Sequence, residues 1–278
     1  MIAESIGAVA GAILAAYLWE KRIRDRISVR RITSRGDADI RGVLDLYELL
    51  FVADAANYSP DDLLEFIDPT EAFSVKRHVR AENIVLVAKQ HDDVVGILLC
   101  HFYPERAKGI ISYHGVNPAV PAANASAGPL LLRLLRRILL RGGRKCDFLL
   151  FEIEEAPIRR TDGKRRRRNA LFERFRINAS GLGLRALRLE FPYHCPKVSL
   201  EETAEERLLD LVCIPIKAEL PKPVPRLAVL DLLAFLHLDC YGDLYCTDDP
   251  RFPIYRQYLQ GRVEHYRTTL PDAVDYSE

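Results

Sequence analysis

Two carboxylates, Glu152 and Glu154, stand at the end of an apolar run, Cys146–Ile153, that predicts a β-strand. They alternate with Phe151 and Ile153, so both point to one face of that strand. A partly buried carboxylate has a raised pKa, which suits it to take a proton from an ammonium group. The other interpretation is a pair of edge or solvent-facing charges without a chemical role.

A tyrosine and a histidine, Tyr113 and His114, lie near the end of a second apolar run, Gly109–Val116. Both side chains can exchange protons, so both are candidates for acid–base chemistry. A single histidine in such a run is more often structural than catalytic. Tyr193 and His194 form a similar but weaker pair further along the chain.

The residues that most often bind metals give no convincing pattern. His237, Cys240 and Cys246 are the one cluster, and their spacing fits no zinc pattern and lacks an evident fourth ligand. We therefore expect no metal. The chain also lacks a Cys-x-x-Cys pair and a G-x-S-x-G turn, which argues against a dithiol redox site and a serine hydrolase.

Composition restricts the class of protein further. The chain has 278 residues, 49% of them apolar, and a formal net charge of +1. These figures argue against a disordered chain and against a protein that binds nucleic acid through an overall basic surface. Six cysteines in this length do not indicate a disulfide scaffold.

The charge is nevertheless concentrated in blocks, of which Arg159–Arg168 is the densest, with seven Lys or Arg. Such a block could attract an anionic cofactor, a phosphorylated or acidic substrate, or anionic lipid headgroups. Nucleic acid is disfavoured because no aromatic residues are interleaved for base stacking. The alternative is a solvated loop without a partner.

The N-terminus, Met1–Trp19, is apolar apart from Glu4, and a basic stretch follows it from Lys21 to Arg26. Nineteen helical residues span about 28 Å, close to the roughly 30 Å hydrocarbon core of a membrane. We expect residues 1–26 to form a hydrophobic transmembrane helix that anchors a cytoplasmic domain to the membrane, because the positive charges follow the apolar segment. A buried or oligomerising helix is the alternative.

Hydrophobic periodicity predicts the elements that position these residues. The expected strands are Val29–Ser34, Ile84–Ala88, Val94–Phe102, Gly109–Val116, Cys146–Ile153, Leu187–Phe191 and Leu208–Ile216. The expected helices begin near Arg35, at Ser59–Pro60, at Leu130 after a loop of residues 118–129, and near Asn169. After a PKPVP linker, two more helices are expected at Arg226–Leu238 and at Asp248 to Arg267. These divisions give an N-terminal helix (1–26), a domain (27–220) and a C-terminal helical extension (221–278).

The order of these elements and several local motifs resemble the GCN5-related N-acetyltransferase (GNAT) family, over roughly Ser28–Lys217. The similar segments are the opening strand and helix, Gly96 in the third strand, Val116-Asn117-Pro118 after the fourth, and Asn169 to Phe175. The resemblance implies a mixed α/β (α+β) sheet and an acyl-CoA N-acyltransferase fold, to which this chain adds the N-terminal helix and the C-terminal extension.

The resemblance also implies a cofactor site between splayed fourth and fifth strands. In the family the pyrophosphate of acyl-CoA lies on backbone N–H groups at the start of the following helix, which suits an anion. The corresponding residues here, Ala123–Gly128, lack the usual Arg and the first Gly. The expected contacts come from Val116, Asn124, Ser126, Gly128, Arg133 and Asn169. The alternative is that this segment is a plain connection.

Catalytic roles follow from the same resemblance. Many relatives use a tyrosine as general acid in the helix that contains Asn169, and this chain has Phe172 there. Many use a glutamate or a water chain as base, which implies Glu154 or Glu152, with Tyr113 as a further candidate.

We therefore expect an acyl-CoA-dependent N-acyltransferase, most simply an N-acetyltransferase, that transfers directly to a small-molecule or peptide amine. Acetyl-CoA or another acyl-CoA would be the co-substrate. The alternative is a catalytically inactive GNAT-like binding or scaffold protein at a membrane surface, and a homodimer stays open.

Overall fold

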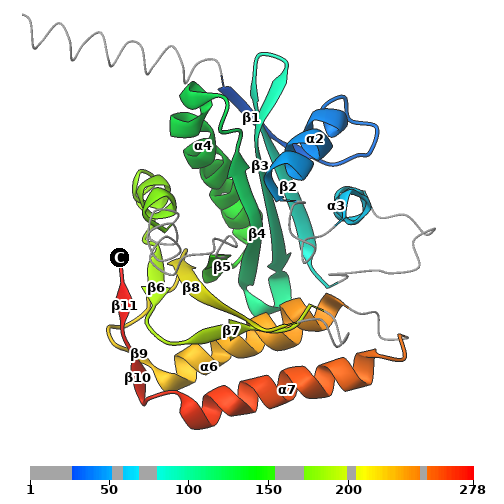
Figure 1. Ribbon diagram of the computed structural model, residues 1–278. Coiled ribbons are helices and arrows are strands. Elements are labelled where there is room, and N and C mark those ends of the chain that lie inside the picture. The colour runs from blue at the N-terminus through cyan, green and yellow to red at the C-terminus, as the bar shows by residue number, and fades with distance from the viewer. Residues whose placement is uncertain (1–26, 52–58, 69–79, 154–171, 199–204, 245–248) are drawn as a thin grey trace, which may run out of the picture.

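The computed structural model describes residues 27–51, 59–68, 80–153, 172–198, 205–244 and 249–278. The described strands form a nine-stranded mixed sheet in the order β1-β2-β3-β4-β5-β8-β6-β11, with β7 paired to β8 (Figure 1). A separate two-stranded sheet joins β9 and β10. The predicted mixed α/β architecture is therefore confirmed. Its strands are β1 (Ile27–Ile32), β2 (Glu82–Gln90), β3 (Asp93–Tyr103), β4 (Lys108–Val116), β5 (Phe148–Ile153), β6 (Leu187–Leu189), β7 (Tyr193–Cys195), β8 (Arg207–Pro215), β9 (Val224–Pro225), β10 (Ala273–Val274) and β11 (Tyr276–Ser277).

Strands β4 and β5 are the one parallel pair among the described strands β1, β2, β3, β4, β5 and β8. Strands β1 to β4 pair antiparallel in chain order. Strand β5 then pairs parallel with β4, and β8 pairs antiparallel with β5. A parallel pair needs a crossover connection, which the long helix α4 (Pro121–Leu140) supplies.

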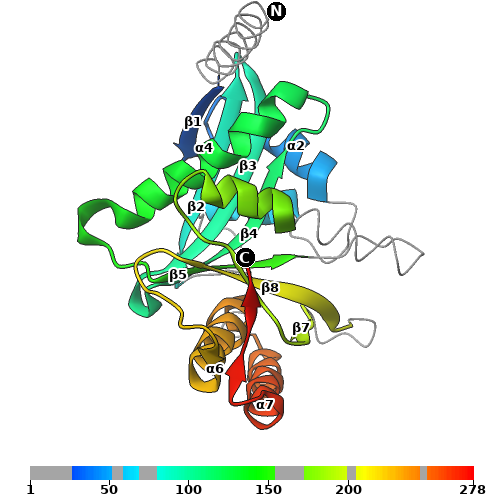
Figure 2. The same ribbon diagram turned by 90° about the vertical axis from the view of Figure 1, so that its left-hand side faces the viewer.

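Helices cover both faces of this sheet (Figure 2). Helix α4 and the helix of residues 172–180 pack on one face, here called the α4 face. Helices α2 (Ile40–Phe51) and α3 (Pro60–Ile67) pack on the other, the α2 face. Strands covered on both sides should be continuously apolar, and β3 is buried from Val95 to Tyr103.

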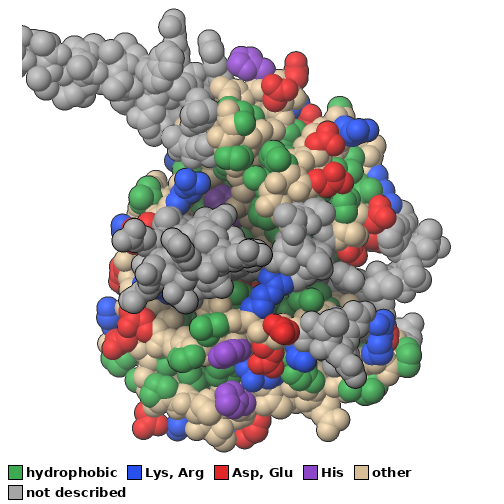
Figure 3. Space-filling model, in the orientation of Figure 1, with side chains coloured by type: hydrophobic (Ala, Val, Ile, Leu, Met, Phe, Trp, Pro, Cys, Tyr) green, Lys and Arg blue, Asp and Glu red, His purple; other side chains and the backbone are tan. Residues whose placement is uncertain are grey.

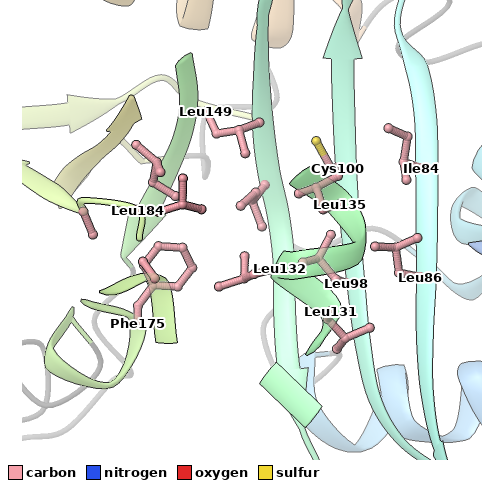
Figure 4. Packing of buried hydrophobic residues seen from close by; sticks show 14 of the residues in the cluster. Ile84, Leu86, Leu98, Cys100, Leu131, Leu132, Leu135, Leu149, Phe175 and Leu184 are labelled. Carbon is pink, nitrogen blue, oxygen red and sulfur yellow. The ribbon is translucent and has the colours of Figure 1, made fainter. Parts of the chain in front are cut away.

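The core on the α4 face shows how closely helix and sheet approach. Leu131, Leu132 and Leu135 of α4 project onto Leu86 and Leu98 of the strands (Figure 4). Such contacts remove apolar surface from water and so stabilise the fold, at roughly 25 cal/mol for each Å².

Gly96 lies beneath α4 in this core. A Cβ atom there would lie 3.2 Å from Leu131 Cδ1 and 3.4 Å from Ala127 Cβ. The glycine therefore permits the helix to approach the sheet closely. This is a packing reason for a glycine at one of the positions that carry the resemblance.

The C-terminal extension packs on the α2 face, below the lower strands in Figure 1. It consists of α6 (Arg226–Ala234), a π-helix η3 (Phe235–Cys240), a 3₁₀-helix η4 (Tyr241–Leu244) and α7 (Phe252–Thr269). Val229, Leu233 and Leu236 share one buried cluster with Ile110 of β4 and Leu150 of β5. The extension and the sheet therefore have a common core.

Two expectations from the sequence need correction. The segment 118–129 was expected to be a loop, but α4 begins at Pro121 and contains Pro129 in its interior. The small residues of this segment fit against the sheet as a helix, since Ala127 and Gly128 are buried there. A transmembrane helix was also expected, but no described helix is both long enough and apolar enough to cross a membrane. Residues 1–26, where that helix was placed, lie outside the described residues.

Charge is distributed in a mixed pattern on the face shown in Figure 3, where acidic and basic side chains alternate over the described surface. The basic block Arg159–Arg168 lies outside the described residues. So does Cys246 of the weak metal cluster, and among the described residues no group of three His, Cys, Asp or Glu is arranged to hold a metal ion.

Candidate functional site

Strands β4 and β5 part from each other near the middle of the sheet. They pair from Lys108 with Phe148 to Ile111 with Phe151, and no further pair between them occurs in the described residues. Strand β4 continues to Val116 and β5 to Ile153. Beyond Ile111, therefore, the edge of β4 that faces β5 is not used in the described ladder.

An irregularity in β4 marks the same place. Leu99 of β3 is opposite Tyr113, whereas the next residue, Cys100, is opposite Ile111, so Ser112 is an extra residue in β4. Such a β-bulge bends its strand and increases its twist. The bulge accounts for the divergence of β4 from β5, and we call the region between the two diverging strands the splay.

The α4 side of the splay is aromatic. Phe151 and Phe175 stack with ring centroids 4.7 Å apart, and His114 meets Phe175 edge-on at 5.7 Å. The His114 Nε2 atom lies 3.3 Å from the carbonyl oxygen of Gly128 in α4. Burial lowers the pKa of His114 to about 4, against the opposing effect of the Gly128 carbonyl. The imidazole is therefore neutral at pH 7 and is a weak base.

The α2 side of the splay carries the carboxylate. Glu152 is the first β5 residue after the last pair with β4, and it is opposite Leu211 of β8. Its Oε2 accepts a hydrogen bond of 2.9 Å from the Tyr241 hydroxyl, and its Oε1 accepts one from the Tyr193 hydroxyl. Burial, reinforced by the Glu152 charge, raises the pKa of both phenols well above the usual value, so both remain donors at neutral pH.

Tyr113 lies on the same side but in a different environment. Its ring meets Tyr47 edge-on at 5.0 Å and Phe51 at 4.7 Å, both from α2. The side chain is 8% exposed and belongs to the cluster under α2 and α3. The structure thus places Tyr113 beside the splay as part of a packed aromatic group, and its catalytic role stays a prediction.

Four of the six predicted cofactor residues, Asn124, Ser126, Gly128 and Arg133, lie along α4 instead of in a loop before it. Val116 ends β4 opposite Gly96, and Asn124 lies in the first turns of α4. Ser126 is buried, and Arg133 is exposed twelve residues after the start of the helix, about 18 Å along its axis. Arg133 is therefore far from the α4 N-terminus.

Gly128 has a packing role in this position. A Cβ atom there would lie 2.8 Å from Asn178 Nδ2 and 3.4 Å from His114 Nε2. Its predicted contact with a cofactor, like those of Val116, Asn124, Ser126 and Arg133, stays a prediction. Glu154 and Asn169 lie outside the described residues.

The start of α4 offers a small anion-binding group. The first four N–H groups of an α-helix have no partner within the helix. Val120 N–H donates to the Asn117 carbonyl, and Pro121 has no N–H. By this rule the next two N–H groups, those of Ala122 and Ala123, are the ones suited to an anion, and the positive end of the helix dipole favours one there.

Phe172, at the place where the resemblance implies a general acid, is 2% exposed. The Arg188 guanidinium lies over its ring, 4.9 Å from the centroid. The phenyl ring is thus part of the core and offers no proton.

The partners of Glu152 cannot be identified from the sequence. Tyr241 is 89 residues away from Glu152 along the chain, and no local motif connects them. In the sequence, Tyr193 is only a weak acid–base candidate. The one available signal was the high tyrosine content of the apolar C-terminal segments.

The comparisons with known proteins come from structure alone. No protein-family model matches the chain, and no curated protein sequence matches it. A search of solved structures matches 103 chains. The chain is thus similar in structure to proteins of the family that its motifs resemble, as three examples illustrate.

The first example is a tandem GNAT protein from the clavulanic acid biosynthesis pathway, which is 17% identical over 60% of this chain, with a TM-score of 0.42. This chain spans 46% of that protein, less than half its length. The second is a protein assigned to the GNAT family from Bacteroides thetaiotaomicron, 15% identical over 77% of this chain and 98% of its own, with a TM-score of 0.44. The third, also assigned to the GNAT family, is from Desulfovibrio desulfuricans, 14% identical over 68% of this chain and 99% of its own, with a TM-score of 0.40.

Proposed function

We propose that this chain is an acyl-CoA-dependent N-acyltransferase that uses acetyl-CoA and an amine acceptor. The observation that carries the proposal is the splay, where β4 parts from β5 at the Ser112 bulge and leaves a strand edge outside the described ladder. An exposed strand edge binds an extended chain through backbone hydrogen bonds. The pantetheine arm of CoA is such a chain, because it contains two amide groups.

The two ends of the cofactor have matching groups. The N–H groups of Ala122 and Ala123 at the start of α4 suit the pyrophosphate, because the N-terminus of a helix binds anions. They lie close along the chain to the splay, since α4 begins five residues after β4 ends. The thioester at the other end of the arm would lie along the splay, which Glu152 borders on the α2 side. The residues present therefore fit an acyl-CoA, although the pyrophosphate contact moves to an earlier part of the chain than the sequence predicted.

The reaction is a direct transfer. The amine nitrogen attacks the thioester carbonyl carbon, a C–N bond forms, the C–S bond breaks, and CoA leaves as its thiolate. The amine loses one proton, which a carboxylate accepts, and the thiolate takes a proton from solvent because Phe172 has none to give. We assign this step to Glu152, which borders the splay on the α2 side, and Glu154 stays a second candidate.

A second function is favoured by one observation. Phe172 is buried beneath Arg188, so the general acid of many relatives has no equivalent at this place in the fold. A protein that binds acyl-CoA without transferring the acyl group would tolerate this change. The two functions differ in turnover and agree in cofactor binding.

Isothermal titration of the full chain with acetyl-CoA tests the proposal. We expect a saturable heat and a rise in the unfolding temperature, and a weaker response to ATP, an adenine nucleotide without the pantetheine arm. Longer acyl-CoAs test the length of the acyl pocket. If no acyl-CoA gives either a heat of binding or a thermal shift, acyl-CoA binding is refuted. Binding without release of free thiol in the presence of a panel of primary amines would instead support the non-catalytic function.

A further inference from the structure

The Glu152 carboxylate is held by side chains from outside its own strand. Tyr193 comes from β7, and Tyr241 comes from η4 in the C-terminal extension. The two phenols donate to different oxygens of this carboxylate, so together they fix the orientation of the group. Two buried thiols of the described residues, Cys195 of β7 and Cys240 of η3, also feel the Glu152 charge.

The tyrosines are in turn fixed by a buried aromatic group. His237 of the π-helix is completely buried, and its ring lies 6.0 Å from that of Tyr193, 6.4 Å from Tyr241 and 5.8 Å from Tyr266. Tyr266 stacks on Tyr193 at 6.4 Å, and its hydroxyl accepts a 2.7 Å hydrogen bond from His194 N–H. Single-turn π-helices are rare and are found frequently at functional sites.

Ion pairs attach the extension to the strands beside this group. Asp239 pairs with Arg106 at 2.8 Å and with Arg80 at 3.1 Å. Asp231 of α6 pairs with Lys108 at the start of β4 at 2.8 Å. These contacts connect the segment that carries Tyr241 to the strand that forms one side of the splay.

We propose that the C-terminal extension is a working part of the candidate site, in which Tyr241 is a positioning residue that orients the Glu152 carboxylate towards the amine acceptor. The inference rests on the proposed function, since it gives Glu152 the role of base. It goes beyond that function in assigning a task to residues 221–278, which the resemblance does not require.

The test compares Tyr241→Phe with Tyr258→Phe, which removes a phenol of the same extension that donates to another carboxylate, Glu206, at 2.8 Å. Both changes keep the ring and delete one hydroxyl. Full-length protein labelled with [5-¹³C]glutamate reports the titration of each carboxyl by NMR, and the Glu152→Gln variant identifies the Glu152 signal.

Loss of a donor to a carboxylate disfavours its charged form. We expect the Glu152 titration midpoint to rise by about one pH unit in Tyr241→Phe and to stay unchanged in Tyr258→Phe. In thiol-release assays, the ascending limb of the pH–rate profile should move in the same direction. An unchanged Glu152 midpoint in a folded Tyr241→Phe protein overturns the inference. Failure of acetyl-CoA to bind the wild-type chain overturns the proposed function instead, so the two failures are distinguishable.

Discussion

Replacing His237 should change how the stability of this protein depends on pH. Burial, with a smaller effect from the Arg262 charge, lowers the pKa of His237 to about 3. In the unfolded chain a histidine has a pKa near 6.5. Between these values the unfolded state binds a proton that the folded state does not, so the free energy of unfolding falls as the pH falls from about 6.5 towards 3.

The magnitude follows from the two pKa values. The linkage relation gives a loss of about 2 kcal/mol between pH 7 and pH 5 from His237 alone. The His237→Leu and His237→Gln variants lack this proton site. His114, whose pKa is also lowered to about 4, contributes a similar dependence to all the proteins and cancels in the comparison.

Urea unfolding of wild type and both variants at pH 7, 6 and 5 measures the difference. We expect each variant to lose about 2 kcal/mol less than wild type over this range. His265→Gln is the matched control, because His265 is exposed on α7, and it should retain the wild-type dependence. Parallel pH profiles for wild type and both His237 variants would refute the argument, whatever their stabilities at pH 7.

Three other substitutions test the packing at two glycines and one buried ion pair. Gly109→Ala should destabilise the protein by about 1–3 kcal/mol, measured by urea unfolding, since its Cβ would lie 2.9 Å from Leu149 Cδ2 between β4 and β5. Gly261→Ala should instead stabilise α7 by about 0.5–1 kcal/mol, because nothing lies within 4 Å of its Cβ position; a lower unfolding temperature would contradict this. Arg80→Gln should cost about 1–3 kcal/mol by leaving the buried Asp243, which pairs with Arg80 at 2.6 Å, without its counter-charge. An unchanged urea midpoint for Arg80→Gln would show that Asp243 does not need the pair.

Local patterns predicted the elements whose signal is contained in their own residues. The hairpin of β2 and β3 has continuous apolar runs around a polar turn, and the structure extends both strands by only a few residues. Helix α3 begins as expected at Pro60, because Ser59 and Asp62 form a capping box that is visible in the sequence.

The start of α4 could not be predicted in the same way. Pro129 suggested the beginning of a helix, since proline is favoured in the first turn and disfavoured later. The structure keeps the helix through Pro129, where burial of Ala127 and close packing of Gly128 against His114 favour the helical path. These are tertiary contacts, and no local propensity contains them.

The candidate site shows the same division. The sequence correctly placed Glu152 near the end of a central strand but could not identify its environment, because the residues that contact it come from segments 41 and 89 residues away. The Ser112 bulge was equally hidden, since it is defined by its register against β3. Both features depend on which segments meet in space.

The placement of Glu152 also explains why the extension cannot be treated as a separate appendage. Leu150 and Glu152 alternate with Leu149 and Phe151, so they face the C-terminal helices while their neighbours face α4. The Glu152 carboxylate is half-buried beside this apolar core, and the Tyr193 and Tyr241 hydroxyls donate hydrogen bonds to it. Burying a polar group without hydrogen bonds is costly, so these two bonds help to accommodate the carboxylate. The hydroxyl groups that help the fold to accommodate Glu152 are therefore the same groups to which we assign its orientation at the splay, so the packing of the extension and the proposed chemistry share these hydrogen bonds.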